Sequence, residues 1–193
     1  MNKLPLMQQV LGNQRTQLPA VLQKHYQHRD NTEVGVLNIE YPVFMQPYLS
    51  FLRLMGALIN RRGKQIPTTV SKRMVGDIQY WHRSISFPNG RVVLFKSRWT
   101  YAGGNELIEY INPFVGLRMR VHVNTGCLYY QGRHYIVKLG RILLPIPEWL
   151  VLGHTTIEEK ALDDKRFSMD FRLRHPWFGQ LFRYAGVFRV DGD

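Results

Sequence analysis

The stretch that decides the fold is residues 79–99, QYWHRSISFPNGRVVLFKSRW. It predicts a β-hairpin, because strand-like runs flank the turn residues Pro88, Asn89 and Gly90. A two-residue turn at Asn89 and Gly90 would pair Pro88 with Arg91, but proline has no N–H for that closing pair. A three-residue loop instead puts proline at the first turn position and glycine at the left-handed bulge position. The sequence therefore favours the three-residue loop.

This loop fixes the register of the hairpin, and the register turns one arginine inward. It places Phe87 opposite Arg91 and Arg83 opposite Phe95. The face that we expect to be buried carries Trp81, Arg83, Ile85, Phe87, Val93, Phe95, Ser97 and Trp99. The face that we expect to meet solvent carries Tyr80, His82, Ser84, Ser86, Val92, Leu94, Lys96 and Arg98. The other register mixes charged and large apolar groups on both faces, so Arg83 is predicted to be the one charge on an apolar inner face.

Length and composition indicate a globular domain with a basic surface. The chain has 193 residues, of which 45% are hydrophobic and 12% aromatic, enough for one domain with a substantial core. Its formal charge of +12 at pH 7 predicts either a plain solvated basic surface or an anionic partner. Among anionic partners we expect a membrane surface before nucleic acid, because lysines and arginines are scattered singly along the strands.

Several kinds of chemistry find no support in the sequence. The lone Cys127 excludes an internal disulfide and a multi-cysteine zinc site, and it is best interpreted as a structural thiol. No phosphate loop, dinucleotide fingerprint, nucleophile elbow or zinc-helix motif is present. We therefore expect no cofactor and no metal, and the sequence names no catalytic residue. No secretory signal and no run of 18 apolar residues is found, so we expect a cytoplasmic protein, with peripheral contact to the inner membrane as an option.

The fold that these patterns predict is mainly β. After a first strand at 32–41, strand signals cover nearly the whole chain from Ile66 onward. The expected strands are 66–75, 78–87, 91–100, 105–111, 115–123, 127–131, 133–140, 151–161, 166–174 and 180–190. Such a series predicts an antiparallel meander of about ten strands that must curl into a barrel or half-barrel to protect its edges. Two prolines interrupt residues 143–150, which we expect to cross an open end of the sheet.

Helical segments accompany this sheet. Residues 1–30 are expected to form an N-terminal extension of helix and loop, with a short helix that Pro19 begins, and residues 31–193 a single β-rich domain. Residues 44–60 predict an apolar helix packed in or over the sheet, with Arg53 at its rim. Its expected inward stripe is Phe44, Tyr48, Phe51, Leu52, Met55 and Ile59. Three interpretations of this helix stay open: a core helix, a mobile lid, or a contact for an anionic membrane. Arg61, Arg62 and Lys64, which follow the helix, suit both a helix C-terminus and anionic headgroups.

Arg83 has one candidate partner inside the sheet. A three-residue loop at 102–104 would set Glu109 opposite Ser97 on the inner face, whereas a two-residue turn at 103–104 would send Glu109 outward. If both side chains point inward we expect an ion pair, because an unpaired buried charge is costly. Three interpretations of that pair stay open: a neutralised structural pair, an arginine that meets the head group of a ligand, or a catalytic pair.

Short motifs in a fixed order point to a known family. They are Leu18-Pro19 followed by His25, Trp81-x-Arg83, Phe95-x-Ser97, Glu109, Leu144-Pro145-Ile146-Pro147, Pro176-Trp177-Phe178-Gly179 and Tyr184-x-Gly186. Over residues 18–190 the chain thereby resembles a bacterial family called domain of unknown function 4166. Its members stand alone or are appended to saccharopine-dehydrogenase-like reductases, and the resemblance implies no catalytic residue. This chain has no Rossmann half, so the resemblance implies no reductase activity for it.

The leading functional hypothesis is a non-enzymatic binding module for an apolar or amphiphilic, lipid-like ligand inside the curved sheet. The candidate ligand-binding residues are Arg83, Trp81, Phe95, Ser97, Trp99 and Glu109, and the candidate anion or membrane contacts are Arg61, Arg62 and Lys64. Two alternatives stay open: an enzyme that uses Arg83 and Glu109, and a purely structural or partner-docking domain. An interior cavity of about 300 Å³ or more would favour binding, and a solid core would favour the structural domain.

Overall fold

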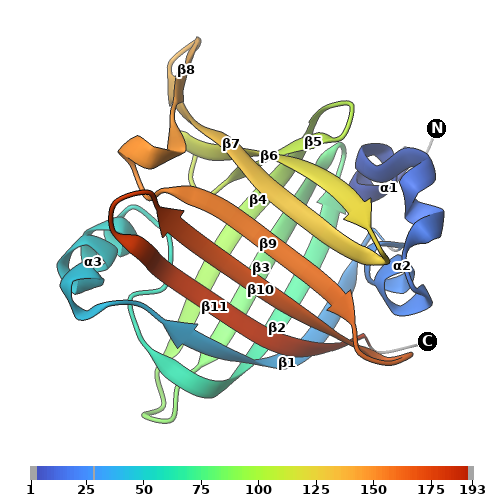
Figure 1. The fold of residues 1–193 in the computed structure, drawn as a ribbon, viewed down its shortest axis with the longest axis horizontal. Coiled ribbons are helices and arrows are strands. Elements are labelled where there is room, and N and C mark those ends of the chain that lie inside the picture. The colour runs from blue at the N-terminus through green and yellow to red at the C-terminus, as the bar shows by residue number, and fades with distance from the viewer. Residues whose placement is uncertain (1–3, 28, 191–193) are drawn as a thin grey trace.

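The strands form a closed antiparallel barrel (Figure 1). The computed structural model describes residues 4–27 and 29–190. Its strands are β1 (Asn31–Glu40), β2 (Gly63–Val75), β3 (Ile78–Ser86), β4 (Val92–Gly103), β5 (Glu106–Tyr110), β6 (Val115–Asn124), β7 (Cys127–Leu139), β8 (Ile142–Ile146), β9 (His154–Ala161), β10 (Arg166–His175) and β11 (Gly179–Val190). They pair in the order β6-β5-β4-β3-β2-β1-β11-β10-β9-β7-β8, and β6 also pairs with β7, which closes every strand except β8 into a ring. The predicted antiparallel meander is confirmed, and closure protects the edges of its strands.

Short helices cover both ends of the barrel (Figure 1). At one end lie α1 (Leu6–Leu11), η1 (Gly12–Gln17) and α2 (Ala20–Gln27), and at the other lie η2 (Val43–Met45) and α3 (Gln46–Leu54), while η3 (Glu148–Leu150) precedes β9. Leu6, Leu22 and Leu49, from α1, α2 and α3, share one buried core with the barrel wall. Residues 1–3 and 28 of the expected 1–30 extension lie outside the described residues. None of the described helices is long and apolar enough to cross a membrane.

The hairpin at 79–99 has the predicted register. Arg83 pairs with Phe95, and the Phe87 N–H donates to the Arg91 carbonyl at 2.8 Å across the three-residue loop. Gly90 has a φ of 77°, the left-handed conformation that the bulge position requires. Most of the predicted inner face is buried, Arg83 included, and the predicted outer face is exposed or half-buried. The turn residues alone were therefore sufficient to place this arginine inside.

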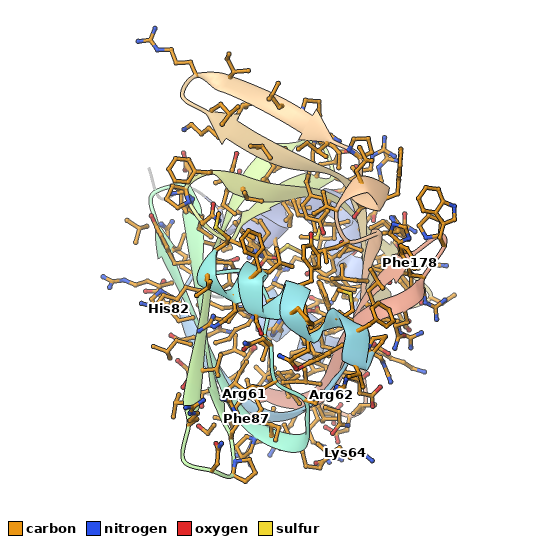
Figure 2. The ribbon with its side chains drawn as sticks, turned by 90° about the vertical axis from the view of Figure 1, so that its left-hand side faces the viewer. Arg61, Arg62, Lys64, His82, Phe87 and Phe178 are labelled. Carbon is orange, nitrogen blue, oxygen red and sulfur yellow. The ribbon has the colours of Figure 1, made fainter. Side chains whose placement is uncertain are left out.

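The helix expected at 44–60 is wrong in its length and in the face that it buries. α3 ends at Leu54, and Gly56 follows with a φ of 81°, which ends the helix. α3 lies over one end of the barrel (Figure 2), and Leu49 is its one buried residue. Of the expected stripe, Phe44, Tyr48, Phe51 and Met55 are exposed, Leu52 is half-buried and Ile59 is buried after the helix ends. A nearly all-apolar segment does not itself indicate which side packs, so its sequence could not choose between the faces.

Two expectations further along the chain are also wrong. Segments 127–131 and 133–140 form one strand, β7, because a register shift opposite Arg118 and Met119 absorbs an extra residue at the expected break. Residues 142–146 form β8, which pairs with β7 as an outer strand instead of crossing an open end. Pro145 is compatible with β8 because an outer strand has an edge that needs no N–H donor. The β7–β8 hairpin projects from the barrel (Figure 1).

We expect Leu49→Ala to lower the free energy of unfolding by about 2–5 kcal/mol, as loss of a core leucine does. Leu49 is fully buried under α3, whereas Leu54 on the same helix is 85% exposed. Leu54→Ala is the matched control and should change stability by less than about 0.5 kcal/mol. Urea unfolding measures both variants, and equal losses would contradict the orientation of α3.

Candidate functional site

Arg83 lies inside the barrel among aromatic rings. Alternate residues of β3 point inward, and Arg83 is 8% exposed. Its Nη1 donates to Ser97 Oγ at 2.9 Å, and its Nη2 lies 3.4 Å from Glu109 Oε1. Its guanidinium carbon lies 5.0 Å from the centre of the Trp81 ring and 5.1 Å from that of Phe95. The structure thus brings these five predicted residues together through an ion pair, a hydrogen bond and two cation–π contacts.

Glu109 faces inward, but in a register that differs from the predicted one. β5 pairs Glu109 with Trp99 instead of Ser97, and the register between β4 and β5 shifts between Tyr101 and Gly103. Ser97 and Trp99 are two residues apart, and the side-chain period of a strand is two, so either partner leaves Glu109 on the inner face. Its contact with Arg83 is longer than the usual 2.7–2.9 Å or so of a charge-assisted hydrogen bond, so the guanidinium keeps donor capacity for another acceptor.

A second charged cluster lies inside the barrel, and the sequence analysis missed it. Lys72 of β2 is 2% exposed, and its Nζ lies 3.0 Å from Glu33 Oε1 and 3.2 Å from the His25 carbonyl oxygen. Glu33 Oε1 also contacts His25 Nδ1. Lys72 Nζ lies 4.6 Å from the centre of the Trp81 ring, so this cluster adjoins the Arg83 cluster. The alternation of β2 could have revealed Lys72, because it falls on the same side as Val70.

Glu159 and two tyrosines extend this second cluster. The Tyr26 hydroxyl donates to Glu159 Oε2 at 2.7 Å and lies 2.5 Å from the Tyr130 hydroxyl. Glu159 Oε1 lies 4.0 Å from His25 Nε2. Burial raises the pKa values of both tyrosines well above their usual range, so both stay neutral hydrogen-bonding groups at physiological pH.

The two carboxyl groups of this cluster have pKa values that are shifted in opposite directions. Burial raises the pKa of Glu159 and lowers the pKa of Lys72. Burial also acts to raise the pKa of Glu33, but the nearby His25 and Lys72 outweigh it and leave that pKa below its ordinary value. Glu33 is therefore stabilised as a carboxylate, while Glu159 is shifted toward the neutral acid.

We expect the free energy of unfolding to fall as the pH rises from the ordinary carboxyl pKa of 4.5 through the raised pKa of Glu159. In that window the folded state holds a proton that the unfolded state has released, so Glu159 contributes a slope of at most about 1.4 kcal/mol per pH unit. Glu33 titrates below this window because its pKa is lowered. Glu159→Gln should flatten the profile, and Glu158→Gln, on the exposed side of β9, should not. Urea unfolding at several pH values checks this, and parallel profiles for wild type and Glu159→Gln would contradict it.

Two small cavities lie on either side of the Arg83–Glu109 pair, with Tyr184 bordering both. The first measures about 40 Å³, and its lining includes His25, Glu33, Trp81, Arg83, Trp99, Tyr130 and Glu159. The second measures about 60 Å³, and its lining includes Ala57, Leu58, Phe95, Glu109, Leu117, Tyr135 and Phe171. Burial raises the pKa of Tyr184 to about 12, so a neutral phenol borders both spaces. Neither cavity reaches the roughly 300 Å³ of an ordinary ligand site.

Two residues that line the first cavity carry hydrogen-bond donors without partners. The indole Nε1 atoms of Trp81 and Trp99 are buried and have no hydrogen-bond partner in the described part of the chain. The centres of the two rings lie 4.3 Å apart, and both side chains line the cavity together with Arg83. An unsatisfied buried N–H costs about 1–3 kcal/mol, so an oxygen atom bound here would recover that free energy.

The predicted anion contacts lie apart from this interior. Figure 2 shows Arg61 and Arg62 below α3 and Lys64 farther from α3, at the lower edge of the barrel, and Arg62 lies over the Tyr41 ring at 4.7 Å. The structure therefore does not join them to the Arg83 cluster. Within residues 4–27 and 29–190, no three His, Cys, Asp or Glu side chains gather as a metal site.

Comparison with known proteins gives one family match. The family model described as "Domain of unknown function (DUF4166)" matches residues 18–188. No curated protein matches the chain. One solved structure, a mutant of the fluorescent protein UnaG, has 14% sequence identity and a TM-score of 0.37, over 84% of this chain and 96% of that one. That likeness is too distant to bear on function.

Proposed function

Since the chain belongs to the family of domain of unknown function 4166, whose description assigns no activity, we propose its function from the interior of the barrel. We propose a non-enzymatic binding module for an amphiphilic, lipid-like ligand. The observation that carries the proposal is the first cavity, whose lining residues include Arg83 and two tryptophans with unpaired indole N–H groups. Pockets with aromatic walls and a few converging polar groups are typical of ligand sites.

The donors favour a ligand whose head group carries oxygen acceptors. Arg83 has five N–H donors and two polar partners, Ser97 and Glu109, the second of them at 3.4 Å. A carboxylate or a similar oxygen-rich group could accept from Arg83 and from the Trp81 and Trp99 indoles at once. The second cavity, on the other side of Arg83, is lined mainly by apolar residues and suits the tail.

The size of the cavities requires the barrel to open. The first cavity holds a head group or a few water molecules, since one water needs about 10–15 Å³. A whole amphiphile therefore needs additional space, and the end beneath α3 is the place to gain it, because Ala57 and Leu58 directly after α3 line the second cavity. If the barrel does not open, these volumes favour a structural domain instead.

The proposal includes a location as well as a ligand. Arg61 and Arg62 lie below α3 in Figure 2, and Lys64 follows at the start of β2. We propose that these three residues bring the protein to an anionic membrane surface from the cytoplasmic side. This contact would be sensitive to salt, because charges are screened beyond roughly 8 Å at physiological ionic strength.

Native mass spectrometry and a titration with oleate test the binding function. We expect purified protein to carry a co-purifying amphiphile or to take up oleate. Trp81→Phe/Trp99→Phe, which removes the indole donors but keeps aromatic rings, should weaken oleate binding about tenfold or more. Tyr101→Phe is the matched control, because Tyr101 is exposed and the change likewise removes a polar hydrogen while keeping an aromatic ring. If the protein carries no ligand and takes up neither oleate nor oleyl alcohol, the proposal is contradicted. A purely structural domain would then be the remaining interpretation.

Hydrogen exchange tests the opening of the barrel. If α3 is a lid, amides of residues 48–58 should exchange faster than those of the 79–99 hairpin, because opening the lid leaves the sheet folded. Oleate should slow exchange in 48–58. Equal protection of both segments would make α3 a fixed part of the core and would rule out this route of entry.

A further inference from the structure

The end of the barrel that carries α3 presents large apolar side chains to solvent. They are Phe44, Phe51 and Leu54 of η2 and α3, with Trp149 of η3 and with Trp177 and Phe178 of the β10–β11 turn. We call these six residues the α3-end face. Leu54 is 85% exposed and Trp177 is 74% exposed. Exposed apolar patches on soluble proteins mark interaction sites, and the interior site does not account for this one.

Contacts between the segments hold these side chains at the same end. The Tyr48 hydroxyl donates to the Val151 carbonyl at 3.4 Å, which joins α3 to the segment after η3. The centres of the Trp149 and Trp177 rings lie 6.0 Å apart, which joins η3 to the β10–β11 turn. Figure 2, which looks toward α3, shows Phe178 at the margin of this end and the β7–β8 hairpin above it.

The charge around the α3-end face is strongly basic. The segments that build this end carry Arg53, Arg61, Arg62, Lys64, Arg141 and Arg174. Their acidic residues are Glu40, which lies 3.6 Å from Arg183, and Glu148, which is buried beside His154. Segments at the opposite end carry Asp30, Asp77, Asp163 and Asp164 together with Arg15, Lys24, Arg29 and Lys165, so their charges balance. The molecule therefore has a positive pole at its apolar end.

We propose that the α3-end face docks on an anionic lipid bilayer, with α3 lying in the plane of the interface. Tryptophan and phenylalanine side chains bind at the headgroup level of a bilayer, and the surrounding basic residues match anionic headgroups. The apolar side chains and the positive charge therefore both favour an anionic bilayer as the partner. The inference extends the contact proposed for Arg61, Arg62 and Lys64 by assigning the aromatic anchors that insert. It goes beyond the interior binding function and holds whether or not the barrel takes a ligand.

Co-sedimentation with vesicles of phosphatidylcholine, with and without phosphatidylglycerol, tests the docking. We expect association with the anionic vesicles that weakens with added salt. Trp177→Ala/Phe178→Ala should reduce that association about tenfold or more, because two exposed aromatic anchors are lost. Tyr101→Ala/Leu162→Ala is the matched control, since both residues are exposed and lie toward the other end of the barrel. It should bind as wild type does.

Fluorescence reports which end inserts. Trp149 and Trp177 are exposed while Trp81 and Trp99 are buried, so brominated lipids should quench emission in wild type and much less in Trp149→Phe/Trp177→Phe. Binding that is equal for neutral and anionic vesicles, or is unchanged in Trp177→Ala/Phe178→Ala, would overturn the proposal. So would light scattering that shows a dimer for wild type and a monomer for Trp177→Ala/Phe178→Ala. Oleate uptake is measured separately, so failure of docking and failure of interior binding are distinguishable.

Discussion

Lys72→Ala is expected to lower the free energy of unfolding by about 3–5 kcal/mol, the loss typical when one partner of a buried ion pair is removed. Lys72 is 2% exposed, and its Nζ lies 3.0 Å from Glu33 Oε1, so the variant removes the lysine partner of a buried carboxylate. The lysine also packs against the Tyr26 and Trp81 rings, at 5.0 and 4.6 Å from their centres. Denaturant unfolding measures the loss.

A double-mutant cycle separates the ion pair from simple packing. Lys72→Met fills similar volume without charge, Glu33→Gln removes the carboxylate charge, and Lys72→Met/Glu33→Gln removes both. We expect the double variant to be clearly more stable than Lys72→Met alone, because an unpaired charge costs more than an absent pair. Arg73→Ala, on the exposed side of β2, is the control and should stay within about 0.5 kcal/mol of wild type. Additive single losses would show that Lys72 and Glu33 do not act as a pair.

Arg83→Ala is the second variant with a large expected effect. It removes the ion pair with Glu109, the hydrogen bond to Ser97 and the contacts with two aromatic rings. Loss of one partner of a buried pair costs about 3–5 kcal/mol, which for a chain of this size lowers the melting temperature by about 6–20 °C. Because Arg83 lines the first cavity, we also expect less bound ligand in native mass spectrometry.

Lys96→Ala provides the control on the neighbouring strand. The register places Lys96 on the exposed face of the same hairpin, where substitutions usually stay within about 0.5 kcal/mol. Arg83→Lys keeps the charge but loses the planar fork, so it should retain part of the stability and bind oleate more weakly than wild type. Equal changes in melting temperature and ligand content for Arg83→Ala and Lys96→Ala would contradict an interior role for Arg83.

The sequence determined those features that depend on local geometry. Proline at 88 and glycine at 90 restrict the turn, the turn fixes the register of the hairpin, and the register places Arg83 inside. Alternation of period two also predicted the antiparallel meander, and the inward Glu109 followed even though its strand partner differs from the predicted one. These results hold because turn conformation and side-chain alternation are properties of neighbouring residues.

Other features were decided only by the tertiary structure, because these features depend on pairings between residues far apart in the chain. The contact of His25 and Glu33 with Lys72 joins α2, β1 and β2, and no local pattern carries that information. The same holds for the closure of β6 on β7 and for the side of α3 that packs, since an apolar segment can bury any of its faces until the barrel end selects one. Local sequence thus set which residues point inward, and the closed barrel determined which of them meet.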